Sequence, residues 1–398
     1  MLPLNQLTAA ERFTFDATIR GLFGSYEMKT TVQLLNNQHG VISTISHKLL
    51  DGQVDGEAVV MRDGEVDVSM RCMLEFSDPQ HTLSIDSNAP TDGALYLDRM
   101  VRVIVSVRCS FGWVDVPQFT GPITGPVNRD GDILSVKAAG KETFALRSAW
   151  ETYHYKTGYN TSVLRGLLVR AGELTKYMEL PSGTSRISKP ITIGRETKLW
   201  NKAFALASSF NTPRILFYDA RGVARTSPKV TKPVITFATG EGGLLTGEPQ
   251  ISFSVDNLKN AIIVKGGDPA GPKTVVSALV VAPKSHQLSP WKIGRSATSG
   301  RGGYLTMRED NGNLRTFPKA IARGKALLDQ FLLMGTEATW ECLPVWHLEP
   351  WDIANISAKF TGTVRIRSFS RSFGPEPTMT CGYTKDLRRP SRVMRSAA

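Results

Sequence analysis

Apolar and polar residues alternate along the first third of the chain, which is the pattern of strands that bury one face. In residues 66–76 (VDVSMRCMLEF) every second residue is apolar, and residues 101–109 (VRVIVSVRC) repeat the pattern with Ile104 as an exception on the outer face. Shorter strands follow, separated by turns such as NRDGD at residues 128–132, which suits a tight hairpin. Residues 28–148 are therefore predicted to form one closed or nearly closed β-barrel.

The apolar spacing changes to three and four after this region, which indicates helices. Residues 161–178 (TSVLRGLLVRAGELTKYM) and 197–210 (TKLWNKAFALASSF) carry this spacing, and a strand-turn-strand pattern follows at residues 214–226. We therefore expect an α/β domain at residues 150–245. The candidate N-caps of the first helix are Asn160, Thr161 and Ser162.

Strand patterns return after a glycine-rich hinge, in two segments that predict a second barrel. These segments are residues 250–272 and 336–384. The sequence between them, residues 273–335, is expected to form an inserted peripheral domain. Its helix begins at Pro318 and closes with Gly335.

The expected fold class is mainly β with α+β insertions: two similar β-barrel domains plus an α/β domain and an inserted peripheral domain. A chain of 398 residues is too long for one hydrophobic core and agrees with several domains. Residues 1–27 are expected to form an N-terminal arm, without the basic leader and apolar centre of a secretion signal. Residues 385–398 form a basic C-terminal tail.

The formal net charge of +12 is typical of proteins that bind nucleic acid, an acidic partner protein or an anionic surface. The basic residues are spread along the chain and cluster only in the tail, and no aromatic and basic nucleic-acid module accompanies them. We therefore expect no sequence-specific nucleic-acid recognition and no membrane span, and we expect the tail to dock on a neighbouring subunit. The basic residues of the tail are Lys385, Arg388, Arg389, Arg392 and Arg395.

Motifs of enzymes and cofactor sites are missing from the sequence. Residues 257–269 (NLKNAIIVKGGDP) contain a strand and a glycine pair but lack the GxxxxGK[ST] pattern, and the glycines of residues 240–247 lack dinucleotide spacing. There is no HExxH or GxSxG, so we expect no catalytic residue, no metal, no cofactor and no enzymatic activity. The isolated histidines are His39, His47, His81, His154, His286 and His347, and the cysteines, expected to be reduced core thiols, are Cys72, Cys109, Cys342 and Cys381.

Two groups of residues keep alternative functions open. An acidic cluster offers carboxylates for glycan hydrolysis, although most of its members fall on the solvent side of strands or in turns. Trp340, Trp346 and Trp351 lie close together and suit stacking on sugars, although packing in a core or a subunit interface is favoured. The acidic cluster consists of Asp51, Asp55, Asp63, Glu65 and Asp67.

The order of elements and several short passages resemble the tail hub proteins of long-tailed bacteriophages. The first strand set carries LDGQVD (residues 50–55) and LEFSDP (74–79), the second opens with the Asn260-bearing strand NLKNAIIVKGG, and PVWHLEPWDIANI (344–356) follows later. The resemblance covers about residues 28–385 and is greatest to minor tail proteins of siphophages that infect actinobacteria. It implies that the glycine pair after the Asn260-bearing strand is a turn and not a phosphate site.

This resemblance implies a structural virion protein of the tail tip, assembled in the host cytoplasm. In such hubs three chains form a homotrimer whose six barrels build a pseudo-sixfold ring. The ring adapts the sixfold tail tube and distal tail protein above to tip, fibre or spike proteins below, and it leaves a channel for DNA ejection and for the tape measure protein. The alternative is a virion-associated carbohydrate-binding or cell-wall-hydrolysing protein.

Overall fold

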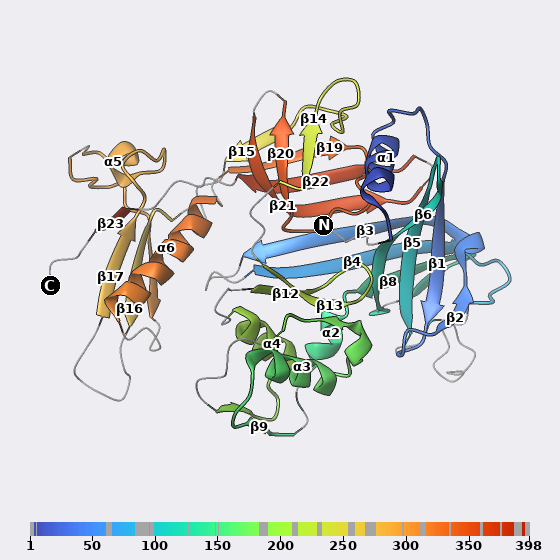
Figure 1. Ribbon diagram of the computed structural model, residues 1–398, viewed down its shortest axis with the longest axis horizontal. Helices are drawn as coiled ribbons and strands as arrows, with labels where there is room; N and C mark the ends of the chain where they lie inside the picture. The colour runs from blue at the N-terminus through green and yellow to red at the C-terminus, as the bar shows by residue number, and fades with distance from the viewer. Residues whose placement is uncertain are drawn as a thin grey trace.

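The protein is mainly β with α+β insertions, as the sequence predicts (Figure 1). Two sets of strands share one hydrophobic core, and two smaller units with helices pack beside them. The computed structural model describes residues 4, 6–60, 66–83, 95, 99–125, 127–147, 149, 151–182, 190–208, 214–228, 233–253, 259–266, 276–296, 298–310, 316–333, 336–358, 361–374, 376–385 and 392–394.

The first strand set divides between two sheets. One sheet has the order β2-β1-β5-β6, and the strands β3, β4, β8 and β7 belong to a ten-stranded sheet. An isolated bridge between Ile123 and Ala138 connects the two sheets, so the set curves as a half-closed barrel. The strands are β1 (Met28–Leu35), β2 (Val41–Thr44), β3 (Leu49–Val60), β4 (Val66–Ser77), β5 (Met100–Cys109), β6 (Gly112–Pro122), β7 (Asn128–Asp130) and β8 (Ile133–Ala139).

The alternating pattern that predicts these strands is confirmed by their burial. The alternate apolar side chains of β4 are at most 5% exposed, and those of β5 are at most 7% exposed. These side chains are Val68, Met70, Cys72, Leu74 and Phe76 in β4 and Val101, Val103, Val105, Val107 and Cys109 in β5. Met73, which is 47% exposed, and the half-buried Ile104 lie on the other face. The predicted hairpin is also present: β7 pairs with β8 through a turn in which Gly131 has a φ of +57°. That φ lies in the left-handed region, which glycine adopts without steric cost.

A passage of the first set, LEFSDP, ends in a buried ion cluster. Asp78 is fully buried, and its carboxylate accepts hydrogen bonds from Lys48 Nζ at 2.5 Å and Arg129 Nη2 at 2.8 Å. Burial alone would raise the pKa of Asp78, but the hydrogen bonds from Lys48 and Arg129 lower it below its usual range. Asp78 therefore fastens the end of β4 to β7 and to the segment before β3.

The long strand β21 (Thr361–Ser372) joins the two strand sets. One edge of β21 pairs with β22 (Met379–Lys385). The other edge pairs first with β20 (Ile353–Ser357), over residues 361–365, and then with β3, over residues 368–372. The register shifts between Ile366 and Ser368, which indicates a bulge where the strand passes from one set to the other.

The second strand set closes on itself through backbone hydrogen bonds. Leu245 N donates to Ala238 O at the end of β14, and Leu245 bridges to Cys342 of β19. The predicted boundary of the α/β domain at residue 245 is therefore wrong, because β14 pairs with β20. The strands of this set are β14 (Ile235–Ala238), β15 (Gln250–Phe253), β19 (Thr336–Cys342), β20, β21 and β22.

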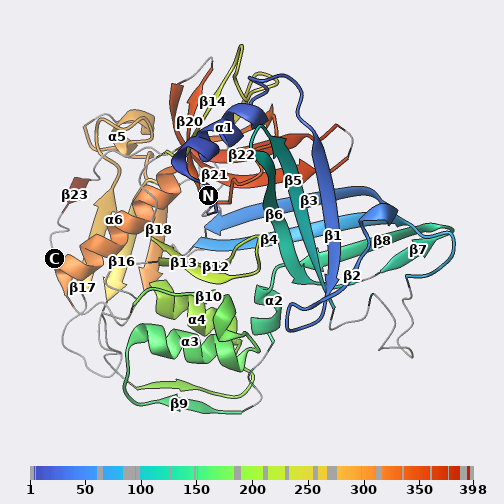
Figure 2. The ribbon, with the colours of Figure 1, turned by 45° about the vertical axis from the view of Figure 1, so that its right-hand side comes forward.

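The α/β unit covers residues 142–228 and packs beneath β3 and β4 (Figure 2). Helix α3 begins at Asn160, and its N-cap is Tyr159, without a side-chain hydrogen bond. The predicted N-caps are therefore wrong, because Asn160 and Thr161 lie in the first turn and are buried. The elements are α2 (Glu142–Ala145), β9 (Tyr153–Tyr155), α3 (Asn160–Arg170), η2 (Thr175–Tyr177), β10 (Met178–Glu179), β11 (Ile191–Ile193), α4 (Leu199–Ser208), β12 (Arg214–Tyr218) and β13 (Ala224–Pro228).

A peripheral unit forms the left side of Figure 1, where α6 covers one face of a sheet with the order β18-β16-β17-β23. The expectation that residues 250–272 belong to one strand set is wrong, since β15 pairs with β19 but β16 belongs to this separate sheet. Gly266 ends β16, and Gly267 lies outside the described residues. The elements are β16 (Ala261–Gly266), β17 (Val276–Val281), α5 (Pro290–Ile293), β18 (Thr306–Asp310), α6 (Phe317–Leu333) and β23 (Arg392–Met394).

Both ends of the chain contribute ordered elements. Helix α1 (Ala9–Ile19) begins with a capping box between Thr8 and Glu11, and its Phe15 and Ile19 enter the shared core. In the basic tail, β23 pairs with β17 of the same chain. Residues 392–394 of the tail therefore form a strand of the chain's own peripheral sheet, which differs from the expected docking on a neighbouring subunit.

Candidate assembly surface

The acidic cluster does not form a pair of carboxylates among the described residues. Asp51 and Asp55 lie along β3, where Asp51 accepts from the Gly52 backbone and Asp55 from Gln53. Asp63 and Glu65 lie outside the described residues. Asp67 is half-buried on β4, where burial raises its pKa although Trp200 donates a hydrogen bond. Asp51 and Asp55 therefore make hydrogen bonds within β3.

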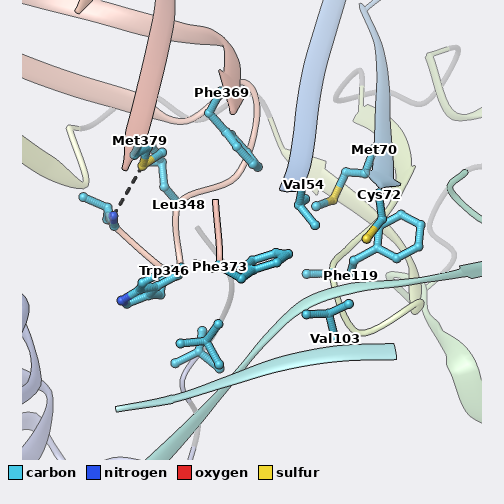
Figure 3. Close-up of a cluster of buried hydrophobic side chains, with 14 of the residues drawn as sticks. Val54, Met70, Cys72, Val103, Phe119, Trp346, Leu348, Phe369, Phe373 and Met379 are labelled. Carbon is cyan, nitrogen blue, oxygen red and sulfur yellow. Dashed lines mark hydrogen bonds between the residues drawn. The ribbon is translucent and has the colours of Figure 1, made fainter. Parts of the chain in front are cut away.

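The three tryptophans of the second strand set are buried. Trp340, Trp346 and Trp351 are 2%, 1% and 8% exposed, and Trp346 Nε1 donates to Tyr26 Oη at 3.3 Å. Figure 3 shows Trp346 beside Phe373 in the shared core. The prediction of core packing is confirmed, and these rings have no free face for a sugar in the single chain.

A buried arginine holds the loop that carries two of these tryptophans, residues 343–352. Arg371 is 1% exposed and donates from Nη1 to the carbonyls of Val345 at 3.1 Å and Trp346 at 2.5 Å. Its Nη2 donates to the Leu348 carbonyl at 3.0 Å. Burial lowers the pKa of Arg371 to about 10, so the guanidinium stays charged at neutral pH. The planar fork of arginine thus fixes three carbonyls of the loop, those of Val345, Trp346 and Leu348.

The same loop contacts the other two parts of the fold. Gln118 of β6 donates to the Trp346 carbonyl at 3.0 Å, and Arg225 of β13 forms an ion pair with Glu349. Trp351 has a φ of +72° and packs against Phe217 of β12 and against β3 and β4. Residues 343–352 therefore sit at the junction of both strand sets and the α/β unit.

A second buried polar cluster joins the first strand set to the α/β unit. Lys141 is 3% exposed, and its Nζ lies 2.7 Å from Glu173 Oε2 and 2.8 Å from His39 Nε2, and it donates to the Gly222 carbonyl at 3.0 Å. Burial, reinforced by the Lys141 charge, lowers the pKa of His39 to about 3. The imidazole is therefore neutral, and its Nε2 accepts from the ammonium.

Glu142 is a buried carboxyl beside this cluster, and it gives the fold a pH dependence. It is 6% exposed, and burial raises its pKa to about 7. The pKa of Glu142 is higher in the folded than in the unfolded protein. The stability that the protonated Glu142 provides is therefore fully present below about pH 4.5, and it is lost as the pH rises through about 7.

We expect Glu142→Gln to stabilise the protein at pH 8 by about 3 kcal/mol, because a neutral amide avoids burying the charge. At pH 4.5 the variant and wild type are expected to be equally stable, which urea unfolding at the two pH values measures. Glu151→Gln, at an exposed position of the same unit, is the control. Equal stabilisation at both pH values would contradict this account of Glu142.

A cavity of about 760 Å³ lies where the N-terminal segment meets both strand sets. Its wall includes Ile19, Tyr26 and Leu49 from the N-terminal segment and first strand set, and Leu343 and Phe373 from the second. Leu50, which also lines the cavity, is 51% exposed, and Leu22 and Phe23, which lie between the lining residues Gly21 and Gly24 in the sequence, are 53% and 68% exposed. Val41 and Ile42 of the edge strand β2 are also exposed, at 53% and 45%.

Several large apolar side chains are thus exposed near the cavity, and exposed apolar surface is a feature of protein interfaces. We call Leu22, Phe23 and Leu50 the apolar rim. No group of three or more metal-ligating side chains occurs in the part of the chain that the structure describes, and no helix there is long and apolar enough to cross a membrane. All four cysteines are buried and unpaired, as predicted.

The sequence matches no protein-family model and no curated protein sequence. The fold, in contrast, is similar to solved structures of tail proteins. The tail protein from Neisseria meningitidis MC58 aligns with a TM-score of 0.56 at 12% identity, over 90% of this chain and 97% of that chain. The 43 kDa tail protein of prophage MuSo2 from Shewanella oneidensis aligns with a TM-score of 0.57 at 11% identity, over 90% and 99%.

A further similar structure is the half-lidded PdpA-VgrG complex from Francisella, with a TM-score of 0.53 at 9% identity, over 99% of this chain and 63% of that chain. At these identities the likeness shows the fold. The chain therefore shares the fold of these two tail proteins over 90% of its length.

Proposed function

We propose that this protein is a structural component of a phage tail, acting as the trimeric hub at the tail tip. The observation that carries this proposal is the similarity of this fold to two solved tail proteins, which the alignment covers over 97% and 99% of their chains. The finer assignment to siphophages of actinobacteria rests on the sequence resemblance given above. The protein has no enzymatic role in this proposal.

The joined strand sets support the hub role. A symmetry adaptor needs two ring-forming modules per chain that keep a fixed relative orientation, and β21 provides continuous hydrogen bonding between them. The ring adapts a sixfold tail tube and distal tail protein to tip and fibre proteins, and it leaves a channel for DNA. The α/β and peripheral units lie outside this ring. The alternative of carbohydrate binding through Trp346 and Trp351 is disfavoured, because both rings are buried.

The mass of the purified protein tests this proposal. We expect light scattering over a concentration series to reach three times 43.6 kDa, and negative-stain images to show a ring. We also propose that the apolar rim is buried between copies. Phe23→Ser is therefore expected to weaken association by about 30-fold, since interface aromatics contribute about 2 kcal/mol.

Val169→Ser, at a 46% exposed position on α3, is the matched control and should leave association unchanged. A monomer at every concentration, also when mixed with a sixfold tail-tube protein, would contradict the trimeric hub. A trimer that Phe23→Ser leaves intact would keep the hub but exclude the apolar rim as its interface.

A further inference from the structure

The net charge of the protein is concentrated in two segments of the sequence. Residues 259–333, which build β16 to α6, contain 12 lysines and arginines against 4 acidic residues. Residues 385–398 contain 5 against 1; Lys385 ends β22, and Arg392 lies on β23, which joins the same sheet as β16 and β17. These two segments together account for the whole formal charge of +12, so the remainder of the chain is balanced.

Within this peripheral unit, a long loop between β17 and β18 carries unneutralised cations. No acidic residue occurs from residue 269 to residue 308. Lys284, Lys292, Arg295 and Arg301 are exposed, and none of them forms an ion pair with a described residue. The nearby acids are used elsewhere: Glu309 pairs with Arg323 and Asp310 with Arg308. We call Lys284, Lys292, Arg295 and Arg301 the cationic loop group.

The loop has a defined shape, because a buried asparagine holds it. Asn260 is fully buried, and its Nδ2 donates to the carbonyls of Leu288 at 2.9 Å and Gly303 at 2.7 Å. Its Oδ1 accepts from Leu305 N at 2.7 Å. Every hydrogen-bonding position of this amide except one lone pair is therefore used to close the loop. The cations project from a fixed frame, which lowers the entropy cost of binding.

The surface of the unit favours a charged polymer over a protein partner. Of the exposed large apolar residues among those described, only Ile293 lies in residues 259–333. Protein interfaces depend on apolar and aromatic anchors, whereas phosphate polymers are bound by clustered lysine and arginine. Trp291 is half-buried, with Lys284 Nζ 5.4 Å from its ring centroid, and adds an aromatic face within the group.

We propose that the cationic loop group binds a linear phosphodiester polymer. Two sources share this chemistry: nucleic acid, and a glycerol-phosphate polymer of a cell envelope. The recognition is of successive phosphates and depends little on sequence, because the four side chains are single cations on flexible stems with few fixed neighbours. This binding role does not depend on the hub proposal, since it uses only the peripheral unit.

The test compares the full-length protein with a variant in which the cationic loop group is replaced: Lys284→Gln, Lys292→Gln, Arg295→Gln and Arg301→Gln. The probes are a 20-base-pair DNA duplex and a poly(glycerol phosphate) of equal phosphate number. Four phosphate contacts give a salt slope of roughly −3.6 on duplex DNA. We therefore expect the wild type to lose about 100-fold more affinity than the variant between 50 and 200 mM salt.

A matched control removes the same charge from the α/β unit: Lys156→Gln, Arg165→Gln, Lys198→Gln and Lys202→Gln, all at exposed positions. This control should bind both probes as tightly as the wild type does. If the wild type binds one of the two probes more tightly, that probe identifies the source of the polymer. Equal weakening in both variants would overturn the proposal, because binding would then follow net charge alone. Absence of binding at 50 mM salt, or equal competition by polyglutamate of the same charge, would also overturn it.

Discussion

Replacement of Arg371 by methionine is expected to destabilise the protein by about 3–5 kcal/mol. Methionine fills part of the volume but removes the guanidinium from three buried carbonyls. The Leu348 carbonyl loses this donor, while Val345 keeps its bond from Leu348 N and Trp346 keeps its bond from Gln118, so that each of these two loses one charge-assisted hydrogen bond. Each buried group that loses its partner costs about 1–3 kcal/mol. Because these carbonyls belong to the loop that joins both strand sets to the α/β unit, the loss is expected to spread through the shared core.

Urea unfolding followed by tryptophan fluorescence measures this effect, since Trp346 lies in the loop that Arg371 holds. Arg371→Lys keeps the charge but loses the planar fork, so an intermediate loss is expected. Arg165→Met, at an exposed position on α3, should change stability by less than about 0.5 kcal/mol. A loss below 1 kcal/mol in Arg371→Met would show that the loop holds its shape without the arginine.

The strands and helices of this fold could be predicted because their signals are local. Alternation located β4 and β5, and helical spacing located α3, α4 and α6 within a few residues. The pairing of strands was harder to predict. No local signal shows that β16 leaves the strand set of β15, or that one edge of β21 is shared by β20 and β3, because pairing depends on contacts far apart in sequence.

The buried polar residues could not be predicted from pattern. Residue type alone predicts that Arg371 and Lys141 are exposed, since charged side chains are rarely buried unless they are paired. Their partners are backbone carbonyls and a carboxylate 32 residues away, which only the fold brings together. In contrast, burial of the tryptophans followed from their apolar character, and the charge of the tail was visible in the sequence although its pairing with β17 was not.

Lys141→Met is expected to destabilise the protein by about 3–5 kcal/mol at pH 8, because it leaves Glu173 buried without its cation. Glu173 is 7% exposed, so its carboxylate cannot reach water without disrupting the contact between the first strand set and the α/β unit. A carboxylate that is desolvated without a cation costs free energy, because burial disfavours the charged form.

The double variant Lys141→Met with Glu173→Gln separates this effect from lost packing. We expect the double variant to be more stable than Lys141→Met alone at pH 8, with a coupling of about 2–3 kcal/mol. Thermal unfolding of wild type, both single variants and the double variant at pH 8 gives the complete cycle. Coupling near zero at pH 8 would mean that the 2.7 Å contact adds no net stability and that Lys141 is retained for its bonds to His39 and Gly222.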